Sequence, residues 1–216
     1  MTTVAVRGES TREVEPELAK FTVVIAARDK DRAATLGRLR ERADALRQFL
    51  DRYDQAIERR ETGGVHVYPE SGRRGERVTA YNGSVSTTVT VTDFAALGEM
   101  MLAVAGQDQT QVHGPTWSLR PDSPVHREAR HAAVADAIAR AREYAEALGA
   151  EVVELVELSD PGLSRGVEGV MDFQAYGGAS MRGKSAGTPE LELDPQRQRA
   201  YAAVEARFTI TSPTRL

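Results

Sequence analysis

The residues best suited to chemistry form a phosphate-binding pattern near the end of the chain. Gly178, Gly183, Lys184 and Ser185 satisfy G-x-x-x-x-G-K-[ST], in which backbone N–H groups and the lysine cradle nucleotide phosphates. Such a loop works between a buried strand and a helix, because the helix N-terminus helps to hold the phosphates. The flanks here, MDFQAYG and AGTPELELDP, supply neither element. We therefore interpret the motif as a chance match and expect neither NTP binding nor a cofactor.

The other candidate groups are four histidines and one serine. His126 and His131 are five residues apart, whereas metal ligands that share one face of a helix stand three or four apart. Ser123 lies near His126, but no third residue that would orient a nucleophile and its base is visible. The chain has no cysteine, which excludes thiolate chemistry and disulfides. We expect no catalytic residue and no metal site. The remaining histidines, His66 and His113, are isolated.

Composition sets the broad class. The 216 residues are 41% hydrophobic and 28% charged, with a net charge of -4, so there is no electrostatic reason to bind nucleic acid. No apolar run is long enough to span a membrane. The opening MTTVAVRGES reads as a strand and lacks the pattern of a secretory signal. These features predict a cytoplasmic protein.

Alternating and helical patterns divide the first half of the chain. They predict a short strand at Val4–Gly8, a strand over Leu18–Arg28 and a hairpin of Val65–Tyr68 with Arg77–Val91. Between them, apolar residues three and four apart predict one long helix from Asp31 to Arg59. That stripe also fits about three heptads of a coiled coil. The strands on both sides favour a helix lying across a sheet.

The second half continues the mixture. Asp93 caps a shorter helix, and an alanine-rich helix follows whose buried face is expected to include Tyr144. The Gly- and Ser-rich segment 160–195 is predicted to be a long mobile loop. The predicted elements are helices over 93–106 and from Asp122 or Ser123 to Gly149, and strands at Val112, 151–158 and 199–211. The expected buried face comprises Val134, Ala137, Ile138, Ala141, Tyr144, Ala145 and Leu148.

Hairpins mixed with helices indicate an α+β fold: a largely antiparallel sheet packed by two long helices and one shorter helix. We expect a single domain over 1–216, with two subdomains at about 1–91 and 92–216 as the alternative. Three side chains of the 160–195 loop are candidates for contact with a partner or a neighbouring subunit, because exposed aromatic side chains bind well to protein surfaces. They are Phe173, Tyr176 and Met181. A disordered loop without a role is the equal alternative.

Four segments together resemble the SIMPL-domain family. They are VAVRGESTREVEPELAKFTVVIAA, YNGSVSTTVTV, HREARHAAVADAIARAREYAEALGAEVVELVELSD and LDPQRQRAYAAVEARFTI. The resemblance covers nearly the whole chain. The chain departs from the family in two ways. Many bacterial relatives carry a signal peptide, whose pattern the first residues of this chain lack, and Asp194-Pro195-Gln196 stands where the family has Pro-Gly.

The resemblance implies self-assembly, in some relatives into channels, and it implies no known enzymatic activity. Bacterial relatives include periplasmic immunogenic and outer-membrane antigens, and a eukaryotic member takes part in kinase signalling. We therefore expect a cytoplasmic, non-enzymatic protein that forms homo-oligomers or binds a protein partner. The alternative is a small-molecule binding protein or enzyme with a site beneath the 160–195 loop.

Overall fold

The described chain forms two compact units that are not consecutive in sequence. The computed structural model describes residues 2–71, 77–163 and 193–215. Unit 1 comprises residues 2–14, 121–163 and 198–215, and unit 2 comprises 15–71, 77–120 and 193–197. The chain thus leaves unit 1 after its first strand and returns at Pro121.

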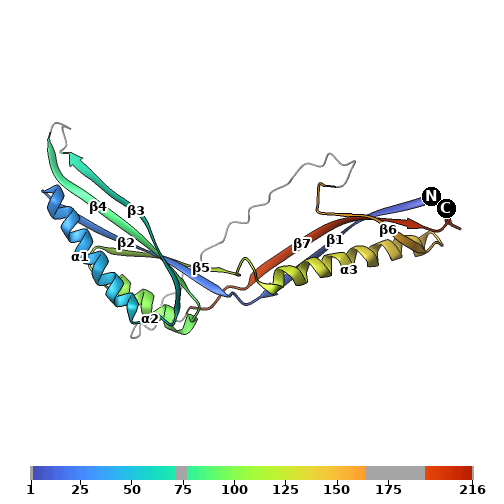
Figure 1. The fold of residues 1–216 in the computed structure, drawn as a ribbon, viewed down its shortest axis with the longest axis horizontal. Coiled ribbons are helices and arrows are strands. Elements are labelled where there is room, and N and C mark those ends of the chain that lie inside the picture. Colours follow the sequence, from blue (N-terminus) through green and yellow to red (C-terminus); the bar gives the residue numbers. More distant parts are fainter. Residues whose placement is uncertain (1, 72–76, 164–192, 216) are drawn as a thin grey trace, which may run out of the picture. The chain divides into compact units, whose positions relative to one another are not determined.

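Unit 2 is a four-stranded antiparallel sheet with two helices (Figure 1). Its strands stand in the order β3-β4-β2-β5, and α1 and α2 both contribute to one core. Asp31 caps α1 by accepting a hydrogen bond from the Ala34 N–H, and Asp93 caps α2 in the same way through Ala95. The elements are β2 (Leu18–Asp29), α1 (Arg32–Asp51), β3 (Ile57–Ser71), β4 (Val78–Val91), α2 (Phe94–Ala105) and β5 (Thr110–Ser118).

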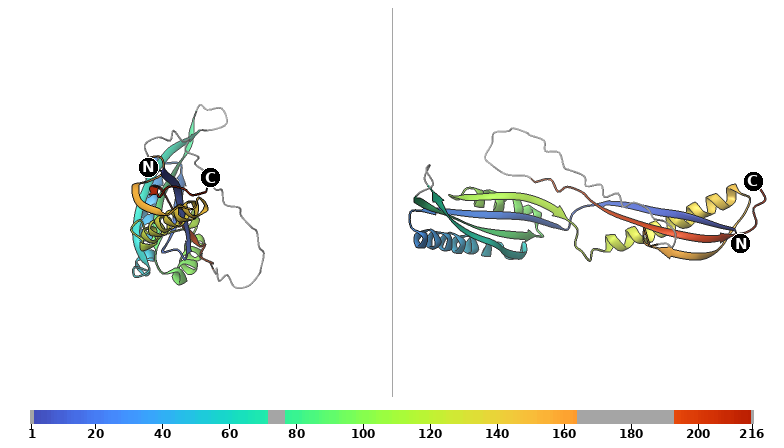
Figure 2. Two further views of the ribbon diagram at one scale, coloured as in Figure 1. Left: turned by 90° about the vertical axis from the view of Figure 1, so that its right-hand side faces the viewer. Right: turned by 90° about the horizontal axis from the view of Figure 1, so that it is seen from above.

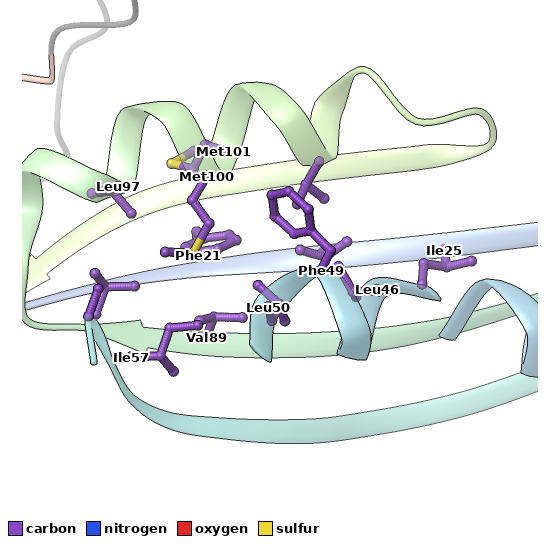
Figure 3. Packing of buried hydrophobic residues seen from close by; sticks show 14 of the residues in the cluster. Phe21, Ile25, Leu46, Phe49, Leu50, Ile57, Val89, Leu97, Met100 and Met101 are labelled. Carbon is purple, nitrogen blue, oxygen red and sulfur yellow. The ribbon is translucent and has the colours of Figure 1, made fainter. Parts of the chain in front are cut away.

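Large side chains fill the core of unit 2. Phe21 and Ile25 alternate along β2 and are almost completely buried. Leu50 from α1 and Met100 from α2 converge on that strand (Figure 3). Each such burial stabilises the fold by about 1.5–3 kcal/mol. This core confirms the prediction that the first apolar stripe belongs to a helix lying across a sheet.

Unit 1 is a three-stranded antiparallel sheet in the order β1-β7-β6, with α3 along one face (Figures 1 and 2). The two ends of the chain form its longest pairing, which runs unbroken from Thr2 opposite Ile210 to Val14 opposite Gln198. The elements are β1 (Thr2–Val14), α3 (Pro124–Ala147), β6 (Val152–Ser159) and β7 (Gln198–Ile210).

A row of alanines brings α3 unusually close to this sheet. The buried residues recur every fourth position, and none of them is more than 1% exposed. Opposite them, a Cβ built on Gly8 would lie 2.5 Å from the backbone nitrogen of Ala137 and closer still to the carbonyl oxygen of Ala133. Only glycine therefore fits at this position of β1. The row comprises Ala129, Ala133, Ala137, Ala141 and Ala145.

The close approach also corrects the expected face of α3. Ala137, Ala141 and Ala145 are buried as predicted, but Tyr144 is 54% exposed. Helix and sheet stand too close at the alanine row for a large side chain, so Tyr144 points to solvent. Val134 and Ile138, at the sides of the row, are partly buried.

The α+β class with antiparallel pairing is confirmed, although the strands form two sheets instead of one. The long helix predicted over Asp31–Arg59 is wrong beyond Asp51: 52–56 form a turn and β3 begins at Ile57. Ile57 fits the helical spacing, but it is buried as the sheet partner of Val91, and that burial overrides the local pattern. Most of the predicted 160–195 loop lies outside the described residues.

Gly8→Ala tests the close contact between α3 and β1. We expect it to lower the free energy of unfolding by about 1–3 kcal/mol or more, because the new methyl group must push α3 away from the sheet. Gly37→Ala is the matched control, since a Cβ there meets nothing within 4 Å. It should be neutral or stabilising by about 0.5–1 kcal/mol in a helix interior. Chemical denaturation measures both, and equal stability of the two variants would contradict the contact.

Candidate functional site

Several groups singled out in the sequence have structural roles or lie outside the described part. Ser123 is the N-cap of α3, and its Oγ accepts a hydrogen bond from the Val125 N–H at 3.4 Å. Within residues 2–71, 77–163 and 193–215, no three His, Asp or Glu side chains come close enough to hold a metal ion. The phosphate-loop match and the loop side chains proposed for partner contact lie outside these ranges. Those residues are Gly178, Gly183, Lys184 and Ser185, and Phe173, Tyr176 and Met181.

A hollow of about 570 Å³ lies at the start of α3. Arg127 and Arg130 line it together with His126 and Asp122, so it joins two positive side chains to the electropositive end of a helix. Its buried hydroxyl, that of Ser123, already serves the helix cap. The hollow is wide and shallow, and it gives no function to the serine and histidine pair noted in the sequence.

Among the described residues, the largest shift of a pKa belongs to Glu70 in unit 2, where the carboxylate forms an ion pair. Arg28 donates two hydrogen bonds to Glu70, at 2.8 and 3.0 Å, and Asn82 donates a third at 2.9 Å. These donors stabilise the carboxylate and lower the pKa of Glu70 to about 2. Because Glu70 is exposed on β3 and its partners Arg28 and Asn82 come from β2 and β4, we interpret the cluster as a link between strands.

The most distinctive surface is the strand β6. Within the described residues it pairs only with β7, so its other side is the edge of the three-stranded sheet. Its apolar side chains are unusually open: Val153 is 64% exposed, and Val156 is 53% exposed. Leu155 and Leu158 are 48% and 47% exposed. An edge strand that is both apolar and open is a template for pairing with another chain.

Two β-bulges determine which way these side chains face. The register shifts between Val152 and Glu154 and again between Leu155 and Glu157, which leaves Val153 and Val156 as the extra residues. These doublets interrupt the alternation in VVELVEL. The strand therefore keeps Leu155 and Leu158 on one face and Glu154 and Glu157 on the other, although the two residues of each pair are three apart in sequence.

The leucines lie on the α3 side of the sheet. Leu155 stands opposite Phe208 and Leu158 opposite Ala206. Those two β7 partners are buried under α3, at 5% and 4% exposure, whereas the leucines are half exposed. Because α3 packs closely over β1 and β7, it covers those two strands and leaves most of β6 open (Figure 2).

The opposite face of the sheet is polar and largely charge-matched. Arg7 pairs with Glu9 at 3.0 Å, and Arg199 pairs with Glu13 at 2.6 Å. Glu157 stands 3.9 Å from Arg207, the limit of an ion pair. Glu154, opposite Thr209, forms no ion pair with any residue in the described part of the chain. Negative charge is therefore left over at the β6 edge.

A smaller hollow of about 220 Å³ lies on this polar face beside β6. Arg7 and Arg207 line it together with Glu157 and Glu205, so its charges balance. Sites for small organic ligands are typically about 300–1,000 Å³. This hollow is thus large enough for one side chain but not for a typical cofactor.

The geometry thus defines an α+β protein with an open, apolar and acidic sheet edge. The chain belongs to the SIMPL family, whose model, described as a protein of unknown function (DUF541), matches residues 4–208. It is similar to the 26 kDa periplasmic immunogenic protein of Brucella melitensis biotype 1 and to the protein of that name from Brucella abortus strain S19. Each is 33% identical over 177 residues, which cover 73% of this chain and 67% of the relative.

These relatives contradict the expected cytoplasmic location, because both carry the name of periplasmic proteins. The expectation rested on the first residues, but residues 2–14 form β1 of the folded unit. Their pattern therefore reports on the fold and says nothing about the compartment. None of the described helices is long and apolar enough to cross a membrane.

Asn82→Ala tests the cause of the Glu70 shift. Removing one donor should raise the pKa of Glu70 from about 2 toward its ordinary value of 4.5. Since the folded-state pKa is the lower one, the ion pair stabilises the protein above pH 4.5 and its contribution is lost as the pH falls toward 2. The carboxyl pKa follows from an NMR titration of wild type and variant. An unchanged pKa in Asn82→Ala would assign the shift to Arg28 alone.

Proposed function

We propose that this chain is a periplasmic protein that binds an extended segment of a partner protein as an added strand beside β6. The observation that supports this most is the row of exposed apolar side chains along an edge strand. An added strand forms backbone hydrogen bonds with the edge that no described strand pairs with, while side-chain contacts supply specificity. The periplasmic location is proposed from the names of the two Brucella relatives, and osmotic-shock fractionation of producing cells tests it.

The binding surface would combine two contributions. Leu155 and Leu158 present about half of their surface on the α3 side, next to the buried Phe208 and Ala206. Apolar side chains of an added strand would extend this buried layer by one strand. Each leucine covered in this way contributes on the order of 1 kcal/mol. The backbone groups of the edge give affinity that depends little on sequence.

A partner segment suits this edge better than a second copy of β6. Antiparallel pairing of two fully overlapping β6 strands would place Glu154 of one copy opposite Glu157 of the other. Like charges directly opposite each other destabilise a sheet. Acidic side chains on an edge are also a known means of preventing self-pairing. The apolar row and the glutamates together favour a different strand.

The test uses a fluorescent peptide of seven residues in which threonine and valine alternate. We expect it to bind the full chain and to slow hydrogen exchange of the β6 amides. The double variant Leu155→Thr/Leu158→Thr should weaken binding about tenfold, or about 1.4 kcal/mol. Fluorescence anisotropy measures the affinity.

Leu36→Thr is the matched control, because Leu36 lies on α1 of unit 2 and is 45% exposed. It should bind the peptide like the wild type. Binding that is unaffected by the double variant, or that leaves exchange in β6 unchanged, would rule out the β6 edge as the binding surface.

A further inference from the structure

We infer that the added segment carries basic residues at every second position, with apolar residues between them. This inference rests on the proposed strand addition and names the chemistry of its partner. It follows from how the bulges place the glutamates of β6. A partner with this pattern would be a Lys- or Arg-containing strand of the type basic-apolar-basic-apolar.

The bulge at Val156 converts a spacing of three into a spacing of two. Glu154 and Glu157 are three residues apart, but they stand opposite Thr209 and Arg207, which are two apart on the regular strand β7. Residues that pair directly across strands share a face, so both carboxylates lie on the polar face of the sheet. A regular strand on the other side of β6 would present its residues i and i+2 to them.

The same register places the apolar positions. Leu155 and Leu158 also stand opposite residues two apart, Phe208 and Ala206, on the α3 face. The residues of the added strand between its basic positions would therefore meet the leucines. One segment with alternating basic and apolar residues would match both the leucines and the glutamates. The leucines alone, or the glutamates alone, would not require this alternation.

The charges of β6 favour a basic segment over an acidic or neutral one. The two glutamates differ in how far the described part of the chain neutralises them. Glu157 already has Arg207 at 3.9 Å, so a basic side chain there meets a partly neutralised carboxylate. Glu154 forms no ion pair within the part of the chain that the structure describes, so it has its full charge to offer. Glu151, exposed just before the strand, adds to the negative charge. Glu154 is thus the main specificity-determining residue.

The test compares three peptides, X-Val-X-Val-X-Val-X, in which X is lysine, threonine or glutamate. We expect the lysine peptide to bind about fivefold tighter than the threonine peptide at 50 mM salt, since each of a few exposed ion pairs adds only a little affinity. The glutamate peptide should bind most weakly. Raising the salt to 500 mM should reduce the preference.

Variants locate the preference. Glu154→Gln should lower the ratio of lysine-peptide to threonine-peptide affinity to about twofold or less, and Glu157→Gln should lower it less. Glu143→Gln removes an exposed carboxylate that lies on α3. It should leave the ratio unchanged and so controls for net charge. A lysine peptide of the same composition with its valines grouped together should bind like the threonine peptide or worse.

The outcomes separate the inference from the proposed function. Equal affinities for the lysine and threonine peptides, with β6 protected by both, would overturn the basic pattern and keep strand addition. Tight binding of the grouped lysine peptide would also overturn it, because charge without alternation would then suffice. If none of the three peptides binds, strand addition itself fails. A dimer in sedimentation that is abolished by Leu155→Thr/Leu158→Thr would assign the edge to a second copy instead.

Discussion

The close contact between α3 and the strands β1 and β7 is the constraint on which unit 1 depends. It requires small side chains on both sides, alanine at every fourth position of the helix and Gly8 on the strand. A helix that approaches this closely covers a narrow band of sheet, which is enough for the edge strand β1 and the central strand β7. The third strand, β6, pairs with β7 and is covered by the helix only near its start, at Val152, so its leucines stay half exposed. In unit 2 the helices pack on the sheet through large side chains, such as Phe21 and Met100, and not through alanines.

Local periodicity was sufficient to predict elements but not their long-range pairing. β2, α2 and β7 follow strict patterns with clear caps or turns, and their predicted positions agree closely with the structure. The first helix was extended too far because Ile57 fits a helical stripe as well as it fits the sheet, and only its pairing with Val91 decides between them. The division into two sheets depends on β1 pairing with β7 at the opposite end of the chain. No window of sequence contains both strands, so this pairing could not be read from either pattern.

The candidate site was missed for the same reason. The strand over 151–158 was predicted, but whether a strand lies at an edge depends on its neighbours. A local signal did exist: the doublets Val152-Val153 and Leu155-Val156 interrupt the alternation, and each coincides with a bulge. The phosphate-loop pattern at Gly178–Ser185 was set aside on its flanks, because a short pattern of residue types means little without the strand and helix that must flank it. The exposure of Tyr144 shows the same limit in α3, since its spacing suits the buried face and only the distance to the sheet excludes it.

An exposed apolar edge is a hazard that proteins reduce with bulges and charge, and β6 has both. The two bulges disturb the regular ladder that another β6 would need, and Glu154 of one copy would oppose Glu157 of the other. These features disfavour self-pairing, but they do not disfavour every strand. A regular segment with basic residues at alternate positions would find the carboxylates at the spacing of its own side chains, and its apolar residues would cover Leu155 and Leu158. Protection against self-pairing and selection of a partner would then come from the same few residues, because a charge that repels one strand attracts another.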